Sequence, residues 1–153
     1  MIGLLQRVSN AQVTVANEVI GRIERGILVF VGVERGDDED SAERLLKRLF
    51  EYRVFPDSQE RMNLSVRDIS GHVMLVPQFT LAANTNKGSR AGFQTAAPPV
   101  DAQRVFEHMM VAARKGKLRV EFGRFGADMQ VSLVNDGPVT FSLKAAPRVK
   151  PQP

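Results

Sequence analysis

The first part of the chain has the hydrophobic pattern of β-strands. Residues 4–8 form a short, mostly apolar run, and residues 11–15 alternate apolar and polar side chains as a half-buried strand does. A third run covers residues 19–23. Residues 26–33 are almost continuously apolar, which predicts a strand that is buried on both faces.

Two later segments have the spacing of amphipathic helices. The acidic residues 37–40 suit the positive end of a helix dipole. The apolar face that follows them consists of Ala42, Leu45, Leu46, Leu49 and Phe50. A second helix is expected to open at Pro99 and Asp101 and to close at residues 115–117. Its apolar face consists of Ala102, Val105, Phe106, Met109, Met110 and Ala113.

The middle of the chain combines one strand with irregular segments. We expect a turn at residues 56–58, and a loop or a single helical turn at residues 62–65. Residues 72–76 are predicted as a strand that runs directly into the Pro-Gln-Phe-Thr sequence of residues 77–80. Residues 84–98 are predicted as a long loop, and loops of that length are usually functional or disordered.

The last third of the chain contains three strand candidates, residues 118–122, 129–134 and 139–143. The second and third alternate apolar and polar side chains along their length. Because only residues 135–138 separate them, the pattern predicts that these two strands form a β-hairpin.

The order of these elements favours a single α+β domain. Strands that are mostly consecutive, together with two main helices, predict antiparallel or mixed β-sheets rather than an alternating doubly wound fold. A length of 153 residues fits one domain, which we expect to cover residues 1–144. Residues 145–153 are rich in Ala, Pro and basic residues and are predicted to form a disordered C-terminal tail.

Composition narrows the classes of protein to which the chain can belong. The absence of cysteine excludes disulfide bonds and thiol catalysis. No apolar run approaches the ~20 residues that a membrane-spanning helix needs. The first residues lack the basic start and the long apolar stretch of a signal peptide. We therefore expect a cytoplasmic protein that is not embedded in a membrane.

Positive charge gathers in the second half of the chain. The formal net charge is only +4, but five basic side chains fall close together: Arg114, Lys115, Lys117, Arg119 and Arg124. One interpretation is a solvated helix end that benefits from the helix dipole. The other is a surface that contacts RNA phosphate groups.

Most familiar catalytic motifs are missing. The two histidines, His72 and His108, belong to different predicted elements, and neither has partners at metal-ligand spacing, so we expect no metal and no cofactor. The chain has no glycine-rich phosphate loop and no Gly-x-Ser-x-Gly sequence. Nothing in the sequence favours either histidine as the base of a Ser-His-Asp triad.

Two short segments remain as candidates for chemistry. Gln78, Phe79 and Thr80 follow an apolar strand, and exposed backbone N–H groups at such a strand end can stabilise the oxyanion formed in ester hydrolysis. Alternatively, Phe79 and Leu81 belong to the core, and the polar pair Gln78 and Thr80 only ends the strand. Gly137-Pro138 is the second segment: a cis peptide there would present two carbonyl oxygens in the same direction, whereas the simpler interpretation is an ordinary turn.

Four sequence segments, taken together, resemble D-aminoacyl-tRNA deacylase, the D-tyrosyl-tRNA deacylase family. They are Met1-Ile2-x-Leu-x-Gln6-Arg7-Val8, Gln78-Phe79-Thr80-Leu81-Ala82, Gly123-Arg124-Phe125-x-Ala127-Asp128-Met129 and Val134-Asn135-Asp136-Gly137-Pro138-Val139-Thr140. The similarity extends in order over roughly residues 1 to 144. It implies a homodimeric hydrolase with a barrel-like core that cleaves the ester bond of D-aminoacyl-tRNA and of mischarged glycyl-tRNA.

The resemblance also implies roles for individual residues. Gln78, Phe79 and Thr80 would form the catalytic pocket for the aminoacylated terminal adenosine of the tRNA. Gly137 and Pro138, as a Gly-cis-Pro motif, would enter the pocket of the other subunit, braced by Arg7. Phe125 and Met129 would lie near the adenosine.

Rigid carbonyl oxygens in that position would select the substrate by repulsion. The side chain of an L-aminoacyl group would have to occupy the space that the oxygens fill, whereas a D side chain points out of the pocket. Glycine has no side chain to repel, so it would not be excluded.

The sequence departs from the family at Pro77, where many relatives have serine. Proline offers neither a hydroxyl nor an N–H group, so we expect the amides that matter to be those after it. The resemblance implies that the reaction uses such backbone groups and the 2′-hydroxyl of the tRNA rather than a protein nucleophile. Two alternatives stay open: Thr80 as a covalent nucleophile, and a dimeric RNA-binding protein without catalysis.

Overall fold

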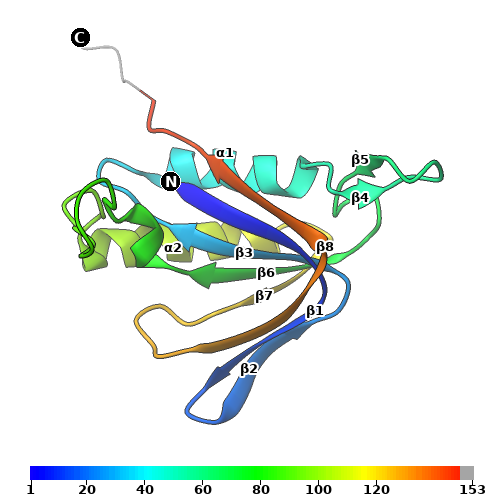
Figure 1. Ribbon diagram of the computed structural model, residues 1–153, viewed down its shortest axis with the longest axis horizontal. Coiled ribbons are helices and arrows are strands. Elements are labelled where there is room, and N and C mark those ends of the chain that lie inside the picture. Colours follow the sequence, from blue (N-terminus) through cyan, green and yellow to red (C-terminus); the bar gives the residue numbers. More distant parts are fainter. Residues whose placement is uncertain (149–153) are drawn as a thin grey trace.

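A computed structural model describes residues 1–148 of the chain (Figure 1). Its elements are, in order, β1 (Ile2–Val15), β2 (Glu18–Ile23), β3 (Gly26–Gly32), α1 (Glu39–Glu51), β4 (Phe55–Pro56), β5 (Met62–Leu64), β6 (His72–Pro77), the short 3-10 helix η1 (Phe79–Ala82), α2 (Pro99–Arg114), β7 (Arg119–Phe122) and β8 (Gln130–Lys144).

One curved mixed sheet forms the centre of the fold, as Figure 1 shows. Its strand order is β2-β1-β3-β6-β7, and β8 pairs with the other side of β1. The β3–β6 and β6–β7 pairs are parallel, whereas β1 is antiparallel to all three of its neighbours. The predicted α+β class with a mixed, barrel-like sheet and two main helices is confirmed. The homodimer stays a prediction.

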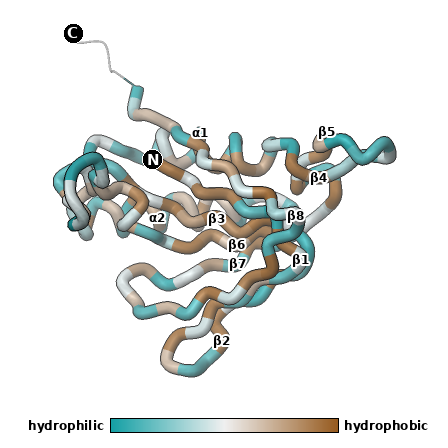
Figure 2. Tube along the Cα trace, in the orientation of Figure 1, coloured by the Kyte–Doolittle hydropathy of each residue, from teal (hydrophilic) through white to brown (hydrophobic). Residues whose placement is uncertain are grey.

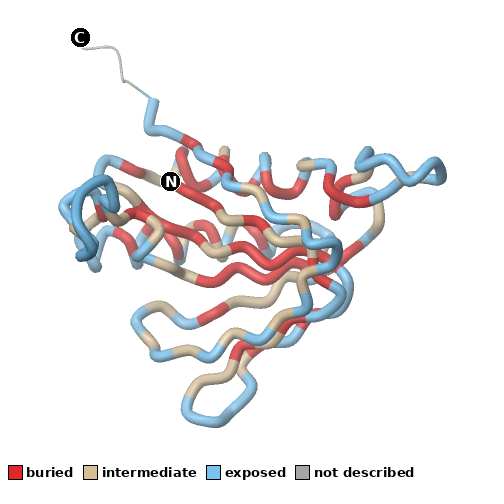
Figure 3. The backbone as a smooth tube through the Cα atoms, in the orientation of Figure 1, coloured by how far each residue is buried: buried red, intermediate tan, exposed pale blue. Residues whose placement is uncertain are grey.

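The central strands β3 and β6 carry apolar side chains on both faces, so both are coloured as hydrophobic and as buried (Figures 2 and 3). Side chains of one face, including Val29 and Leu75, join the core beneath α1 and α2. Side chains of the other face, including Leu28 and Met74, join a second cluster with β1 and β2. The prediction of a strand buried on both faces at residues 26–33 is therefore confirmed.

Both predicted helices form, and each packs its apolar stripe against the sheet. All five apolar residues predicted for α1 are buried, and so are those predicted for α2 except Met110, which is partly buried. The Asp38 side chain caps α1 by accepting a hydrogen bond from the backbone N–H of Ser41 at 3.0 Å. Between the helices, Arg104 forms an ion pair with Glu39, and Nε2 of His108 lies 2.8 Å from Oε1 of Glu43.

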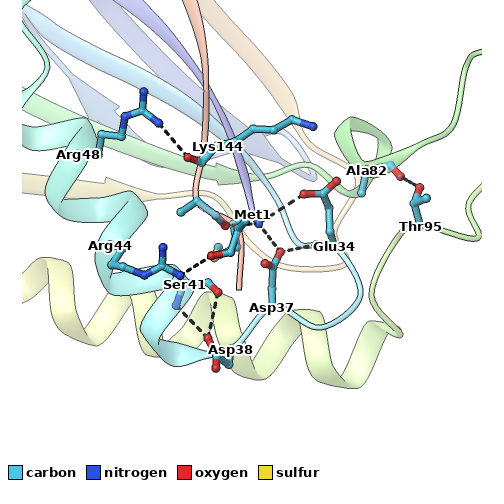
Figure 4. A network of polar contacts seen from close by, with 12 residues as sticks. Met1, Glu34, Asp37, Asp38, Ser41, Arg44, Arg48, Ala82, Thr95 and Lys144 are labelled. Atoms are coloured by element: carbon cyan, nitrogen blue, oxygen red, sulfur yellow. Dashed lines mark hydrogen bonds and ion pairs between the residues drawn. The ribbon is translucent and has the colours of Figure 1, made fainter. Parts of the chain in front are cut away.

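A buried polar network holds the beginning of β1 (Figure 4). The α-ammonium group of Met1 lies 2.5 Å from Oδ2 of Asp37 and donates to the carbonyl of Ala145 at 2.9 Å. The N–H of Ala145 donates back to the carbonyl of Met1 at 3.0 Å, and Ala145 is buried. Residue 145, the first residue of the predicted tail, thus pairs with the start of the chain. Residues 149–153 of the predicted tail lie outside the described residues.

The predicted hairpin of residues 129–134 and 139–143 is wrong. Both segments belong to the single strand β8, and both pair with β1 rather than with each other: Gln130 lies opposite Thr14, and Lys144 opposite Ile2. Two runs of alternating residues around a Gly-Pro turn fit either arrangement. The long partner strand β1 decides between them, since it offers a continuous edge for both halves.

A second correction concerns residues 62–65, for which a loop or helical turn was expected. Residues 62–64 instead form β5, which pairs with the two-residue strand β4. The Asp57 side chain stabilises the connection by accepting hydrogen bonds from the backbone N–H groups of Gln59 and Arg61.

Among residues 1–148, no helix is both long and apolar enough to cross a membrane.

Candidate active site

The segment after β6 forms a short, exposed turn. Strand β6 ends at Pro77, which lies opposite Val31 of β3, and the backbone N–H of Gln78 donates to the carbonyl of Val31 at 2.8 Å. Phe79 then begins η1, and its side chain is 60% exposed. The alternative that Phe79 is a core residue is therefore wrong.

Backbone donors gather at the start of η1. The N–H of Gln78 is used by the ladder with β3, so Phe79 and Thr80 supply the next amides. The first N–H groups of a helical turn have no partner inside that turn. The side chains of the same segment are linked, because Nε2 of Gln78 donates to Oγ1 of Thr80 at 2.5 Å. The turn thus presents amides and a hydroxyl on one small patch.

A pocket adjoins this turn and brings distant segments together. Pro77, Gln78 and Phe79 line one side of it, and Phe106 of α2 and Phe125 line another. The lining is apolar apart from Gln78, but the cavity itself is only about 20 Å³. It has room for about one water molecule, so a larger ligand would lie on the surface beside it. The family resemblance implied that Phe125 lies near the adenosine bound at Phe79, and both residues line this pocket.

Met129 packs against the other face of β6, in the cluster that contains Met74 and Val76. Its sulfur atom accepts a hydrogen bond from the backbone N–H of Arg124 at 3.3 Å. A Cβ atom added to Gly123 would lie 2.9 Å from that sulfur and 3.1 Å from Cδ of Pro77. Met129, Gly123 and Pro77 are thus packed closely, and there is no room for a side chain at residue 123.

Gly32 is a residue beside the candidate site that the sequence analysis missed, and Gly123 appeared there only as part of a motif, without a role. A Cβ atom on Gly32 would lie 2.8 Å from Cβ of Leu81 and 3.3 Å from the carbonyl oxygen of Gln78. Glycine at the end of β3 therefore allows η1 to pack directly against that strand. The only sequence signal was the position of Gly32 at the end of an apolar run.

The long loop predicted at residues 84–98 lies beside η1 at the left of Figure 1. The ring of Phe93 is 5.2 Å from the ring of Phe79, measured between centroids. Asn84 and Gly92 exchange two backbone hydrogen bonds at 2.7 and 3.0 Å, and the hydroxyl of Thr95 donates to the carbonyl of Ala82. The loop is thus folded onto the candidate site.

The second candidate segment projects from the middle of β8. The register with β1 changes there, since Gln6 lies opposite Thr140 while Val8 lies opposite Asn135. The residues in between leave the ladder as a bulge. The Gly137-Pro138 peptide bond in this bulge is cis, and Gly137 has a φ of +134°.

Arg7 joins this bulge to the neighbouring β4–β5 region. Its Nε atom donates to the carbonyl of Asp136 at 3.0 Å, and its Nη1 atom donates to the carbonyl of Val54 at 2.7 Å. The Asn135 side chain spans the bulge by accepting from the N–H of Val139 at 2.9 Å. The bulge is therefore fixed from both sides.

The two candidate segments lie at opposite ends of the sheet, at the left and the right of Figure 1. On β3, Ile27 lies opposite Arg7 and Val31 lies opposite Pro77. Four residues of a strand span about 13 Å. Within one chain, the Gly137-Pro138 bulge is therefore remote from the turn at Phe79.

Among residues 1–148, no group of three or more Asp, Glu or His side chains is arranged to hold a metal ion. The carboxyl groups with shifted pKa values lie elsewhere. The pKa of Asp57 is lowered by hydrogen bonds from the Asn63 side chain and from the backbone of Arg61 and Gln59. The pKa of Asp68 is lowered by hydrogen bonds from the backbone and the hydroxyl of Ser65.

The chain is similar to known proteins over nearly its whole length. Residues 4–144 match the family described as D-Tyr-tRNA(Tyr) deacylase. A protein of Nitrosococcus oceani named D-aminoacyl-tRNA deacylase is 57% identical over 98% of this chain and 97% of its own length. A protein of Alkalilimnicola ehrlichii with the same name is 57% identical over 96% of this chain and 98% of its own length.

Two solved structures share the fold. The c-Myc DNA Unwinding Element Binding Protein superposes with a TM-score of 0.89 at 35% identity, covering 95% of this chain and 99% of that one. A probable eukaryotic D-amino acid tRNA deacylase superposes with a TM-score of 0.77 at 15% identity, covering 93% and 98%. The second likeness concerns the fold alone.

Proposed function

Because this chain belongs to the D-Tyr-tRNA(Tyr) deacylase family, we propose that it hydrolyses the ester bond of D-aminoacyl-tRNA to a free D-amino acid and tRNA. The observation that carries the proposal is the exposed ring of Phe79, flanked by Gln78 and Thr80, beside a pocket. The ring packs against Phe93 and remains accessible to a ligand at the surface.

The proposed substrate is bound through its terminal adenosine. Purine bases stack on aromatic rings, and the exposed ring of Phe79 beside Phe125 offers such a surface. We propose that Met129, which packs against the other face of β6, lies near the same adenosine. The amide of Gln78 lies beside these apolar groups and can bind a polar edge of the nucleoside. This places the ester, which is attached to the ribose, next to η1.

In the proposed reaction, water adds to the carbonyl carbon of the ester. The bond to the ribose oxygen then breaks, and that oxygen leaves with a proton. The negative charge that develops on the carbonyl oxygen is stabilised by the backbone N–H groups of Phe79 and Thr80. The 2′-hydroxyl of the tRNA assists, since Pro77 contributes neither a hydroxyl nor an N–H group at its position.

Selection against L-aminoacyl-tRNA is assigned to a second copy of the chain. Gly137 and Pro138 lie about 13 Å or more along the sheet from the turn of their own chain, so they are not available to their own pocket. Their exposed, braced bulge is suited to enter the pocket of a partner subunit. We therefore propose a homodimer in which each site has a Gly-cis-Pro motif from the other subunit.

The same geometry makes glycyl-tRNA a second proposed substrate. The bulge excludes side chains by occupying space, and glycine has none. We also propose that the deacylase domain covers residues 1–144 and that the protein acts in the cytoplasm, as a tRNA substrate suggests.

The test compares both enantiomers of one aminoacyl-tRNA. Purified protein is expected to deacylate D-tyrosyl-tRNA and to leave L-tyrosyl-tRNA intact, as measured by release of labelled tyrosine. Glycyl-tRNA is expected to be hydrolysed as well. Equal rates on the D and L forms would contradict selection by the bulge, and no hydrolysis of any ester would favour an RNA-binding protein without catalysis.

The variant Thr80→Ala separates the two catalytic mechanisms. If backbone amides and the 2′-hydroxyl carry out the reaction, this variant keeps turnover within about tenfold of wild type, because only the Gln78–Thr80 hydrogen bond is lost. If Thr80 is a covalent nucleophile, turnover and any acyl-enzyme disappear together. Single-turnover kinetics with acid quenching distinguishes these outcomes.

A further inference from the structure

The basic side chains after α2 belong to two different places in the structure. Arg114 and Arg124 line a groove of about 420 Å³ between α2 and β7, and this groove shares Phe125 with the candidate site. Lys117 and Arg119 line another pocket, of about 520 Å³, at the opposite end of β6, beside His72. The charge cluster seen in the sequence therefore extends from the candidate site to the far end of the sheet.

The far pocket receives a third cation from a distant part of the chain. Arg67 precedes β6 and lines the same pocket as Lys117 and Arg119, and we call these three residues the basic pocket. The guanidinium of Arg67 lies 5.5 Å from the centre of the Phe50 ring, an arrangement that orients it while leaving it exposed.

The end of α2 does not explain this arrangement. Basic residues at a helix C-terminus offset the helix dipole, which accounts for Arg114 and Lys115. Arg67 belongs to a separate segment, and Lys117 and Arg119 lie beyond the helix. Three cations from two separate segments converge on one hollow, which indicates an anion as the ligand.

Acidic groups near the basic pocket neutralise it only in part. Its lining, drawn from residues 1–148, contains no Asp or Glu side chain. Glu121 lies close to Arg119, with 3.5 Å between Oε1 and Nε, and partly offsets that charge. Glu43 lines the adjoining groove but is engaged by His108 at 2.8 Å. Arg67 and Lys117 therefore supply most of the uncompensated charge.

We propose that the basic pocket binds backbone phosphate groups of the tRNA substrate. This inference rests on the proposed function for the identity of the RNA. The pocket is separated from the candidate site by the length of β6, from His72 to Pro77, which is about 17 Å. That distance exceeds one nucleotide, so the pocket holds phosphates upstream of the terminal adenosine.

The surface between the two places suits the intervening nucleotides. The groove along α2 has mixed charge, with Glu107 and Glu121 beside Arg114 and Arg124. The guanidinium of Arg114 lies 4.6 Å from the centre of the Phe122 ring and offers a flat cation on which a base can stack. Such alternation of stacking groups and cations is typical of surfaces that follow single-stranded nucleic acid.

The experiment measures binding of uncharged tRNA to the full chain by fluorescence anisotropy at several salt concentrations. Arg67→Gln and Lys117→Gln are each expected to raise Kd about tenfold and to reduce the slope of log Kd against log salt by about 1. Arg61→Gln, which removes an exposed arginine from the β4–β5 hairpin, is the matched control and is expected to leave both values unchanged. Unchanged binding in the first two variants, or an equal loss in the control, overturns the proposal.

Two further measurements identify the source of the phosphate. Hydrolysis of a D-aminoacyl ester of adenosine, which has no phosphate, is expected to be the same in wild type and in the variants. On D-aminoacyl-tRNA the variants are expected to raise KM without lowering kcat. A different result would be that inorganic phosphate saturates the pocket at low millimolar concentration while the Kd for tRNA is the same in the variants and in wild type. The pocket would then be a small-anion site, and the proposal would be wrong.

This design separates the two proposals. If the wild type hydrolyses no D-aminoacyl ester but the variants still weaken tRNA binding, the proposed function fails while the phosphate contact stands. If hydrolysis proceeds but the variants leave binding and KM unchanged, only the phosphate contact fails. The thermal midpoint of Lys117→Gln checks the fold, and it is expected to stay close to wild type because Lys117 is exposed.

Discussion

The turn after β6 and the bulge in β8 are held in place by different kinds of interaction. The turn follows a strand that is buried on both faces, so the core fixes where it begins, and it ends in an exposed aromatic ring. The bulge interrupts a strand of partly buried and exposed residues, and polar groups fix it: Arg7 from β1 and Asn135 from β8 itself. One segment borders a pocket, and the other projects away from the sheet.

This difference indicates how each segment responds to substitution. A turn packed against buried strands tolerates changes at its exposed tip, because the tip contributes little to stability. A bulge that depends on a glycine conformation and a few hydrogen bonds is sensitive to a change in its backbone. The two segments can thus be separated by measuring stability and activity in the same variant.

The largest effect is expected for Gly137→Ala. Gly137 has a φ of +134°, and an added Cβ would lie 2.8 Å from Cγ2 of Val139 and 3.0 Å from Nη2 of Arg7. The bulge must shift, at a cost of about 1–3 kcal/mol in the free energy of unfolding. We expect the ratio of D to L hydrolysis of tyrosyl-tRNA to fall at least tenfold.

Gly36→Ala is the control for Gly137→Ala. Gly36 also has a positive φ, +87°, but its nearest contact to an added Cβ is 3.7 Å away, at Pro147. It is expected to lose stability without losing discrimination between D and L substrates. A Gly137→Ala variant with normal discrimination would show that the shape of the bulge does not select the substrate.

An intermediate effect is expected for Phe79→Ala. The ring is 60% exposed and contacts Phe93, so its removal is expected to change the free energy of unfolding by less than about 1 kcal/mol. Loss of a stacking surface is worth about 1–3 kcal/mol per base, which corresponds to a rise in KM of about fivefold or more. Steady-state kinetics and urea denaturation of one preparation measure both quantities. A large loss of stability with unchanged KM would show that Phe79 stabilises the fold and does not bind the substrate.

The smallest expected effect is a dependence of hydrogen exchange on pH that differs between the β4–β5 hairpin and η1. The folded-state pKa of Asp57 lies below its ordinary value of 3.8, so its ionised form favours the fold. This contribution is complete above pH 3.8 and is lost as the pH falls through the folded-state value. Hydrogen exchange at acidic pH is therefore expected to rise in the β4–β5 hairpin before it rises in η1.

Asp57→Asn tests the origin of that difference. An uncharged amide does not titrate, so the variant is expected to show a weaker dependence of hairpin exchange on acidic pH. Its exchange at neutral pH is expected to be slightly faster, because the hydrogen bond from Asn63 to the carboxylate is lost. If the variant and the wild type show the same pH dependence, another group controls the hairpin.

The amino-acid sequence by itself determined the elements that depend on local periodicity. The buried faces of α1 and α2 and the continuous apolar strand β3 could be predicted, because burial of apolar side chains leaves a regular pattern. The motifs at residues 78–80 and 137–138 could also be found, and they carried the resemblance to the family.

Only the tertiary structure decided how those elements meet. Strand β8 is continuous because β1 offers a long partner edge, and no local pattern distinguishes that from a hairpin. The remoteness of Gly137 from Phe79, and the convergence of Arg67 with Lys117, likewise depend on contacts between segments far apart in the sequence. Such contacts depend on how whole strands and helices pair and pack. The sequence therefore identifies candidate site residues, whereas the tertiary structure decides which of them lie in the same site.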